Sequence, residues 1–527
     1  MNPRASNLLR KIHTSALSAI AVFCFCAVPA NATIRYQISL AHTDSHVFEV
    51  TMVIPQPVRY GMTVAMPAWN ALYEIRDFAF RVSDVRAVPM NDGAANGSDV
   101  PVASVDKQTW RLGNPMLPFA GREPDAYQVT YCVEWNDPGP FDSQLNGHHV
   151  FLNLAEVLMY EPDRRSEPVE VQFKDIPSDW KLIAELRPGP DPNSLVAPSY
   201  DALVDAPVEA GTFSEFEFDD GGAHFRVVVD GKDDQDRLTN YLQRITGYEL
   251  RLMGGPPFRE YTFLIHLGSF SDVGGGGMEH ANSTAISAHS WDGLEDLCAH
   301  EFFHAWNVKR IRPQAFEPID YTKEQYTRVL WFAEGVTSTY ASYTLVRTGL
   351  WSKGEFYDDL ASQITDLQSR PARKWQSAED SSLETWLDKY PAYNDPQRSI
   401  SYYGKGQILG VMLDLAIRDA TSNHKSLDDV MRLMNDEYAK RGKFYNGDAA
   451  IRAAVEKVAG KDFGDFFRRY VAGVDEIPYD KFLAFAGLEL RTSREKDQEV
   501  YSIAEQPQAT ERELTIREGM LRGTTDR

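Results

Sequence analysis

The chain has 527 residues, of which 43% are hydrophobic and 25% charged, and its formal net charge at neutral pH is −22. This composition is ordinary for a packed globular protein, and the length predicts about three domains of roughly 150 residues each. The acidic excess argues against binding to nucleic acid, whose phosphates attract Lys and Arg, and against binding to an anionic membrane surface.

Residues 1–32 have the pattern of a secretory signal peptide. Three basic residues flank the start of the segment, the apolar run SALSAIAVFCFCAV follows, and ANA at residues 30–32 is a cleavage signal. The apolar run is too short to span a bilayer comfortably, and no later stretch reaches the roughly 18 apolar residues that a spanning helix needs. We therefore expect an exported protein, periplasmic or extracellular, with no membrane anchor in a mature chain that begins at Thr33.

The next part of the chain, residues 33–200, predicts an antiparallel β-sandwich-like domain. Runs such as HVFEVTMVIP, FAFRVSDVRAV and YQVTYCVEW alternate and are rich in β-branched and aromatic residues, with Pro, Gly, Asn and Asp between them. We expect a structural or substrate-guiding role for this domain. Residues 187–211 are rich in Pro, Gly and Asp, which predicts a linker at the domain boundary.

Residues 201–490 predict a second domain, of the α+β class. Strands such as FRVVVDG and YTFLIHLG come first, and helical spacing dominates from about residue 290. Helices are expected at 293–308, 323–348, 354–368, 405–420, 426–440 and 447–458. The final segment, 491–527, is charged and poorly periodic, and we expect it to be a disordered tail.

The first motif that carries chemistry is HEFFH at residues 300–304. On a helix, His300 and His304 lie one turn apart on one face, where both imidazoles can bind one Zn²⁺. Glu301 is rotated away from that pair and can take a proton from a metal-bound water, as in H-E-x-x-H. Three fixed letters also arise by chance, so an apolar core helix with two histidines is the alternative.

A third ligand separates these two interpretations. Glu334 lies on the next predicted helix, in LWFAEGVTSTY, and apolar residues surround it. A carboxylate in such surroundings needs a partner, and a His₂Glu set leaves the fourth position of a catalytic zinc open. We therefore favour His300, His304 and Glu334 as ligands of one Zn²⁺ per chain over a capping or solvent-facing Glu334.

The glycine-rich sequence GGGGMEH, residues 274–280, follows a predicted strand. Glycines let the backbone approach a substrate closely, and Glu279 is expected at the start of an edge strand that can pair with an extended peptide. A carboxylate there can hold a free α-ammonium group, so that the enzyme would cut from the N-terminus; a flexible loop with an incidental Glu–His pair is the alternative. The expected substrate-binding residues are Gly276, Gly277, Met278, Glu279 and His280.

Two tyrosines, Tyr402 and Tyr403, precede an amphipathic helix in SISYYGKGQILG. A tyrosine hydroxyl directed at the cleft can donate a hydrogen bond to the oxyanion that develops when water attacks a carbonyl. Tyrosines before a helix are also common packing residues, so the residues alone leave this role open.

Six stretches together resemble the glycyl aminopeptidase family of zinc metallopeptidases, within the thermolysin-like gluzincins. In the family's order they are LVDAPVEAG, GGMEHANST, HEFFHAWNVKRIRP, LWFAEGVTSTY, YYGKG and YVAGVDEIPYD. The resemblance implies a thermolysin-like, mostly helical catalytic domain after the β domain. It implies that the zinc ligands are His300, His304 and Glu334 and that Glu301 is the general base. It also implies that Glu279 binds the amino group of the substrate and that Tyr403, with Tyr402 as the fallback, donates to the oxyanion.

The resemblance also implies a preference for N-terminal glycine, with alanine as the second candidate. The PDZ domain that commonly follows in this family has no matching pattern after residue 490. We therefore expect an exported zinc aminopeptidase acting on peptides with a free N-terminus; a zinc metalloendopeptidase of the same fold and a non-catalytic peptide-binding protein are the alternatives. Lys309, Arg310 and Arg312 are expected to form helix-end and structural ion pairs.

Overall fold

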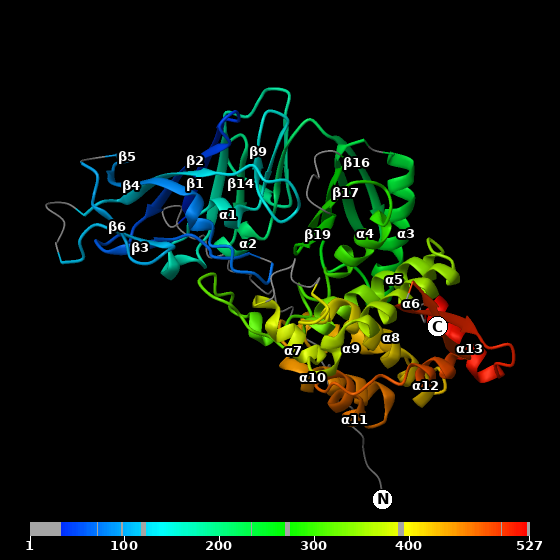
Figure 1. Ribbon diagram of the computed structural model, residues 1–527. Helices are drawn as coiled ribbons and strands as arrows, with labels where there is room; N and C mark the ends of the chain where they lie inside the picture. The colour runs from blue at the N-terminus through cyan, green and yellow to red at the C-terminus, as the bar shows by residue number, and fades with distance from the viewer. Residues whose placement is uncertain are drawn as a thin grey trace, which may run out of the picture.

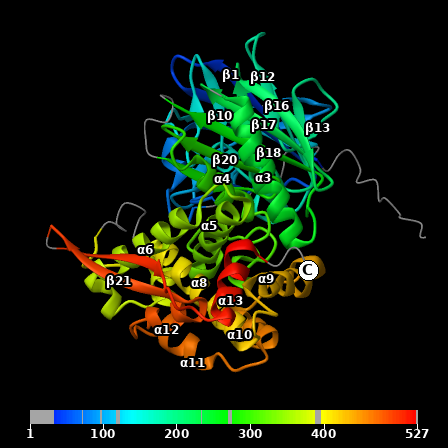
Figure 2. The same cartoon turned by 90° about the vertical axis from the view of Figure 1, so that its right-hand side faces the viewer.

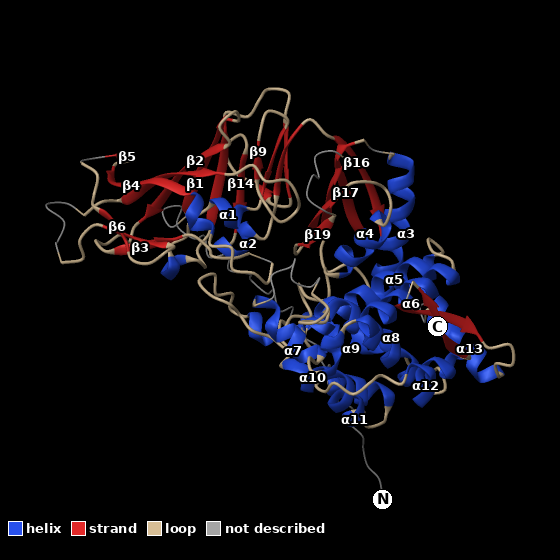
Figure 3. Ribbon diagram, in the orientation of Figure 1, coloured by secondary structure: helices blue, strands red, loops and turns tan. Residues whose placement is uncertain are grey.

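The computed structural model describes residues 33–70, 72–95, 98–116, 123–232, 234–268, 275–387, 395–496 and 498–523. The expected signal peptide lies outside these residues. Figure 1 shows an N-terminal part built of sheets beside a second part that starts with a sheet and continues into helices, and Figure 3 shows the same division by secondary structure. This arrangement confirms the expected α+β class.

The N-terminal domain is built on an eight-stranded sheet in the order β13-β14-β11-β1-β2-β8-β4-β5. Its pairs are antiparallel except for β1 with β11, and buried and exposed residues alternate along β1, as one sheet face packed on a core requires. Its strands are β1 (Ile34–His42), β2 (Val47–Pro55), β4 (Val82–Asn91), β5 (Ala94–Ala95), β8 (Ala126–Glu134), β11 (Val169–Lys174), β13 (Arg187–Pro188) and β14 (Ser194–Ala197).

Two smaller sheets complete this domain, in the orders β3-β7-β6 and β12-β15-β10-β9. Their strands are β3 (Met62–Ala65), β6 (Val102–Ser104), β7 (Thr109–Leu112), β9 (Gln144–Leu145), β10 (His149–Leu152), β12 (Lys181–Ala184) and β15 (Val208–Gly211). The short helices are α1 (Leu154–Val157) and α2 (Tyr200–Val204).

The expected linker at 187–211 is wrong, because this segment folds as β13, β14, α2 and β15. Its Pro, Gly and Asp residues supply tight turns between short elements. Tyr200 and Leu203 are buried, and the Tyr200 hydroxyl donates to the carbonyl oxygen of Leu158 at 2.6 Å. The N-terminal domain therefore extends to Gly211 rather than to residue 200.

The second domain begins with a five-stranded sheet in the order β16-β17-β18-β20-β19. Strands β17, β18 and β20 are parallel, and β19 is an antiparallel edge strand, which confirms the edge position expected for the segment with Glu279. Glu279 is the last residue of β19, not its first. The elements are β16 (Ser214–Asp220), β17 (Ala223–Gly231), α3 (Gln235–Met253), β18 (Glu260–Leu267), β19 (Gly276–Glu279), β20 (Ser283–Ala288) and α4 (Leu294–Phe303).

Helices form the rest of this domain, and several boundaries differ from the expected ones. The helix expected at 405–420 begins at Tyr402, and the one expected at 426–440 ends at Glu437. The helix expected at 293–308 ends at Phe303, and the one expected at 323–348 starts as a π-helix, η5 (Trp331–Val336). None of the described helices is long and apolar enough to cross a bilayer. The remaining helices are α5 (Thr337–Thr348), α6 (Lys353–Ser369), α7 (Ala378–Leu383), α8 (Tyr402–Ala420), α9 (Leu427–Glu437), α10 (Gly447–Ala459), α11 (Gly464–Phe466) and α12 (Tyr479–Leu483).

The disordered tail expected at 491–527 is also wrong for the described residues of that segment, whereas residues 524–527 lie outside them. The chain forms a hairpin, β21 (Leu488–Glu495) with β22 (Gln498–Glu505), followed by α13 (Glu511–Arg522). Helix α13 packs against α5 and α8 (Figure 2). Its residues Ile516 and Met520 lie one turn apart and are buried. Apart from the buried Arg517, most charged side chains of this segment lie on exposed or half-exposed faces, so the composition does not reveal the apolar stripe.

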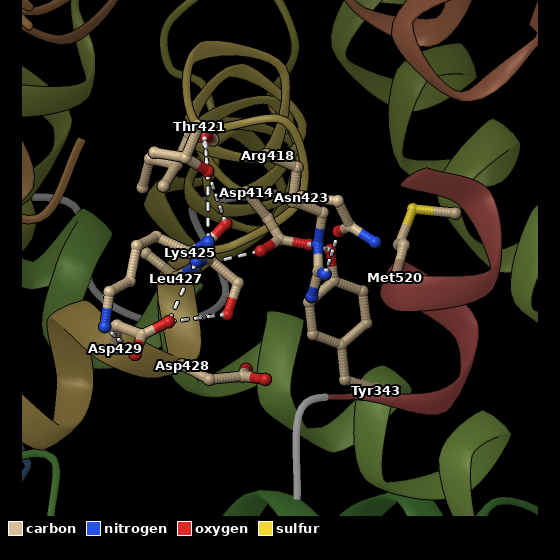
Figure 4. Close-up of polar contacts among 12 residues, drawn as sticks. Tyr343, Asp414, Arg418, Thr421, Asn423, Lys425, Leu427, Asp428, Asp429 and Met520 are labelled. Atoms are coloured by element: carbon tan, nitrogen blue, oxygen red, sulfur yellow. Dashed lines mark hydrogen bonds and ion pairs between the residues drawn. The ribbon is translucent and has the colours of Figure 1, made fainter. Parts of the chain in front are cut away.

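Buried polar contacts lie beneath this last helix. Asp414 accepts hydrogen bonds from the Tyr343 hydroxyl, the Arg418 guanidinium and the Leu427 amide at 2.8–3.0 Å, next to Met520 of α13 (Figure 4). Because Asp414 and Arg418 are fully buried, each needs the other's charge. The C-terminal segment is therefore part of the folded domain.

Candidate active site

Three side chains expected to bind zinc come together where α4 meets η5. Nε2 of His304 lies 3.1 Å from Nε2 of His300, and Oε2 of Glu334 lies 3.5 Å from His300 and 3.2 Å from His304. Ligand bonds of about 2.0–2.1 Å in a tetrahedron place ligand atoms about 3.3 Å apart. The spacing and chemistry of this set therefore fit one zinc ion.

Contacts behind the two histidines fix their orientation. Nδ1 of His304 donates to the carbonyl oxygen of Asn307 at 2.6 Å, and Nδ1 of His300 lies 3.3 Å from the Ser338 hydroxyl, so each Nε2 faces the metal position. The Asn307 amide also donates to the carbonyl oxygen of Phe332 at 2.9 Å, which joins the end of α4 to η5. This role of Asn307 was missed from the sequence, although the residue lies in the NVKRIRP stretch.

The neighbouring histidines stabilise the ionised form of Glu334. Burial opposes ionisation of this carboxyl, but His304 and His300 outweigh burial and keep the pKa of Glu334 well below its usual range. Glu334 is therefore an ionised oxygen donor, as a metal ligand must be.

A close approach between two glycines sets the position of Glu334. A Cβ on Gly335 would overlap the backbone of Gly406 in α8, and a Cβ on Gly406 would overlap the carbonyl oxygen of Trp331. Only glycine at both positions lets η5 lie this close to α8. The π-helix is the local distortion that directs Glu334 at the two histidines, a placement often found at functional sites.

Replacing Gly335 with alanine is expected to destabilise the fold by about 1–3 kcal/mol, because the added methyl group must push η5 away from α8. The displacement would move Glu334 and lower the zinc content of the purified protein. Thermal unfolding and metal analysis measure the two effects. Gly442→Ala is the control for a glycine with open space around it, although its positive φ of 60° adds backbone strain of its own. Unchanged zinc content in Gly335→Ala would contradict this account.

The described chain holds another group with metal-ligand chemistry, formed by His149, Glu209 and His266. Glu209 contacts His149 at 2.9 Å and His266 at 2.8 Å, and Asp230 lies 3.1 Å from His149. The two Glu209 distances are those of charge-assisted hydrogen bonds and are shorter than the roughly 3.3 Å expected between ligand atoms around zinc. We therefore assign this group to a buried ion-pair cluster between β10 and β15 of the N-terminal domain and β17 and β18 of the second.

The ion-pair cluster should make stability depend on pH. Burial acts to lower the pKa of His149, but Glu209 and Asp230 outweigh it and raise that pKa to about 10. The pKa of an unfolded histidine is about 6.5. The contribution of protonated His149 to stability is therefore complete below pH 6.5 and is lost as pH rises towards 10. On the acid side, burial acts to raise the pKa of Glu209, but His266 and His149 lower it to about 2. That contribution is lost as pH falls below the usual value of about 4.3.

His149→Gln is expected to reduce the free energy of unfolding at pH 6 by about 3–5 kcal/mol, because Glu209 loses a buried partner. The decline of stability between pH 6.5 and pH 9 should flatten in this variant. Denaturant unfolding at pH 6 and pH 9 measures both effects. The control is His42→Gln, which changes an exposed histidine paired with Glu49. The assignment fails if His149→Gln retains the pH dependence of the parent protein.

The expected general base, Glu301, is 5% exposed and lies beside β19. A Cβ on Gly277 would overlap its carboxyl group, so this glycine makes room for Glu301. Burial raises the pKa of Glu301 to about 8, although His304 acts in the opposite direction. No described residue donates a hydrogen bond to its Oε2, which leaves that oxygen able to accept one from water.

The expected substrate-binding residues lie on β19 or directly after it. Glu279 is half-buried, and its carboxylate belongs to a group with Glu301 and His304 whose ligand atoms all lie within 4.8 Å of one another. Gly276 lies against the Phe141 ring of the N-terminal domain. Met278 and His280 are buried and line a cavity of about 400 Å³ that adjoins Glu279.

The structure distinguishes the two tyrosines at the start of α8. Tyr402 is fully buried, with its hydroxyl 3.4 Å from that of Thr385. Tyr403 is partly exposed, and its ring centroid lies 6.0 Å from that of His300. Tyr403 is thus the tyrosine that lies beside His300, and its role as oxyanion donor stays a prediction.

The basic residues of NVKRIRP connect the end of α4 to the segment that follows β19. Lys309 binds Asp205 of the N-terminal domain at 2.5 Å, and Asp205 also accepts a hydrogen bond from the Ala281 amide at 2.9 Å. Arg310 donates to the Ala281 carbonyl oxygen at 2.8 Å. Asp205 therefore holds the segment that follows Glu279, a role that was missed although the LVDAPVEAG stretch contains this residue. Arg312 pairs with Glu317.

Comparisons with known proteins match both parts of the chain. A family model described as M61 glycyl aminopeptidase matches residues 294–409, and one described as the peptidase M61 N-terminal domain matches residues 35–212. No curated protein matches the chain.

Solved structures match over most of the chain. A crystal structure of an aminopeptidase N family protein from Idiomarina loihiensis is 27% identical with a TM-score of 0.81, over 88% of this chain and 81% of that one. An M1 zinc metallopeptidase from Deinococcus radiodurans is 15% identical with a TM-score of 0.51, over 85% of this chain and 95% of that one. A mutant of that protein bound to a Tyr-Ser-Ala substrate matches at 15% identity with a TM-score of 0.50, over 85% of this chain and 94% of that one. The two Deinococcus matches show a shared fold.

Proposed function

The chain belongs to the M61 glycyl aminopeptidase family and is a metallopeptidase, since two models of that family together match more than half of it, and we propose that it is a zinc aminopeptidase. It would release small N-terminal residues, glycine first and alanine second, from peptides with a free N-terminus. The observation that carries this proposal is Glu279, a half-buried carboxylate at the end of the edge strand, close to both Glu301 and His304.

Each site residue has a defined task in this reaction. The ion held by His300, His304 and Glu334 would lower the pKa of a water molecule and polarise the scissile carbonyl. Glu301 would take the proton of the attacking water and pass it to the leaving amine.

Substrate recognition would use the edge strand and its neighbours. The outer edge of β19 would pair with the extended peptide backbone, and Glu279 would bind the terminal ammonium group and so fix which bond is cut. Tyr403 would donate a hydrogen bond to the carbonyl oxygen as negative charge develops on it.

Hydrolysis of a chromogenic glycyl anilide by zinc-loaded protein tests the proposal. We expect turnover of glycyl anilide, weaker turnover of leucyl anilide, none of N-acetylglycyl anilide, and one zinc ion per chain by metal analysis. Cleavage of blocked peptides at internal bonds would instead support a metalloendopeptidase. Zinc binding with no turnover of any peptide would support a peptide-binding protein.

Export is the second part of the proposal and rests on the basic, apolar and ANA segments of residues 1–32. Expression of the full chain followed by N-terminal analysis of the mature protein should give Thr33 as the first residue. Recovery of the uncleaved chain from the cytoplasm would contradict export without affecting the zinc site.

A further inference from the structure

A residue of the N-terminal domain reaches the metal ligands. Tyr73 lies in the loop between β3 and β4 and is 6% exposed. Its hydroxyl donates a hydrogen bond to Oε1 of Glu334 at 3.0 Å. The other oxygen of the same carboxylate, Oε2, is the one that faces His300 and His304. The two oxygens of Glu334 therefore have different partners.

This division matters because a glutamate can bind zinc through one oxygen or through both. A hydrogen bond to Oε1 stabilises binding through Oε2 alone, which keeps the protein ligands at three and leaves the fourth position open. Hydrogen bonds to the far side of a ligand also fix its orientation and tune its basicity. Tyr73 supplies such a bond from outside the catalytic domain.

The ring of Tyr73 is held by the catalytic domain on two sides. It stacks on Phe316, with centroids 5.6 Å apart and planes at 18°, and meets Trp386 edge-on at 6.4 Å. Such aromatic contacts restrict the ring without using the hydroxyl. The hydroxyl is therefore directed at Glu334 by packing that would survive its removal.

The loop that carries Tyr73 is tied both to itself and to the catalytic domain. The amides of Arg76 and Asp77 donate to the carbonyl oxygen of Ala68 at 2.8 and 2.9 Å, which closes the loop. The Ala68 amide donates to the carbonyl oxygen of Tyr321 at 2.8 Å, and Trp69 donates to that of Asp320 at 2.8 Å. These hydrogen bonds fix residues on either side of Tyr73 and so hold Tyr73 near Glu334.

We propose that Tyr73 is a positioning residue of the zinc site, through which the N-terminal domain holds Glu334 in one-oxygen binding. Zinc affinity then depends on the docking of the N-terminal domain, which gives this domain a role beyond support or substrate guidance. The proposal rests on the zinc site of the proposed function and deepens it. It requires the hydroxyl of Tyr73, not only its ring.

Tyr73→Phe in the full chain tests this requirement, because phenylalanine keeps the ring contacts with Phe316 and Trp386. The matched control is Tyr36→Phe, which removes a buried hydroxyl of the same domain that donates to the Met159 carbonyl oxygen at 2.8 Å. Zinc affinity is measured by competition with a chelator, and ligand geometry by the visible spectrum of the Co²⁺-loaded protein.

We expect zinc affinity to fall about 10–100-fold in Tyr73→Phe and to stay at the parent value in Tyr36→Phe. The Co²⁺ absorption of Tyr73→Phe should weaken, since two-oxygen binding by Glu334 raises the coordination number. Equal affinities and equal spectra in the two variants would overturn the proposal even if the parent protein cleaves glycyl anilide. A Tyr73-dependent affinity in a protein that cleaves no free peptide would support the positioning role while refuting the aminopeptidase. A parent chain that binds no zinc would refute both.

Discussion

Glu301→Gln is expected to lower kcat for glycyl anilide about 10²–10⁴-fold while leaving zinc affinity near the parent value. The amide can neither take the proton of the attacking water nor return it to the leaving amine. Glutamine matches glutamate in size, so the tight fit against Gly277 is kept. The three ligands, His300, His304 and Glu334, are unchanged. Stopped assays at saturating substrate and metal analysis measure the two quantities.

Glu295→Gln is the matched control, since Glu295 lies in the first turn of the same helix and takes no part in the proposed reaction. It should retain the parent kcat. A Glu301→Gln protein that binds zinc and turns over at the parent rate would remove Glu301 from the mechanism. A Glu301→Gln protein that has lost its zinc would point to a role in the metal site instead.

Glu279→Gln is expected to lower kcat/KM for substrates with a free N-terminus by about 30-fold to 5,000-fold. The reason is the loss of a desolvated charge partner for the ammonium group, a change of about 2–5 kcal/mol. Zinc content should not change, because Glu279 is not among the three proposed ligands. Parallel assays of glycyl anilide and its N-acetylated form measure how far the preference for the free amine has fallen.

Glu317→Gln is the control here, because Glu317 lines the same cavity but pairs with Arg312. If Glu279→Gln slows the free and the acetylated substrates by the same factor, Glu279 serves the chemistry rather than ammonium binding. A loss confined to the free amine would make the enzyme an aminopeptidase by virtue of this one carboxylate.

Local rules account for the parts of the site that could be predicted from the sequence. The spacing of His300 and His304 places both on one helix face whatever surrounds the helix, because the α-helical period fixes it. Glu334 was found because a carboxylate among apolar residues needs a partner. The edge position of β19 followed from the glycine-rich run after a buried strand, although its direction of pairing with β20 came only with the structure.

The predictions based on composition were wrong in two segments where turn-forming or charged residues belong to folded elements. Residues 187–211 contain many turn formers and still supply β15, whose partners are β10 and β12. The C-terminal hairpin and α13 are charged on their exposed faces, and the burial of Ile516 and Met520 depends on α5 and α8. Neither partner surface is visible in a local window of sequence.

The sequence by itself determined the chemistry of this protein: which side chains can hold zinc, which carboxylate can act as a base and which can bind an amine. Those properties follow from residue type and from short-range periodicity. Only the tertiary structure decided how these side chains are held in place. Tyr73 donates a hydrogen bond to Glu334, Asp205 accepts one from the segment after Glu279, and Gly335 packs against Gly406. These contacts join residues far apart in the chain, and their formation depends on the packing of whole domains, which no local pattern encodes.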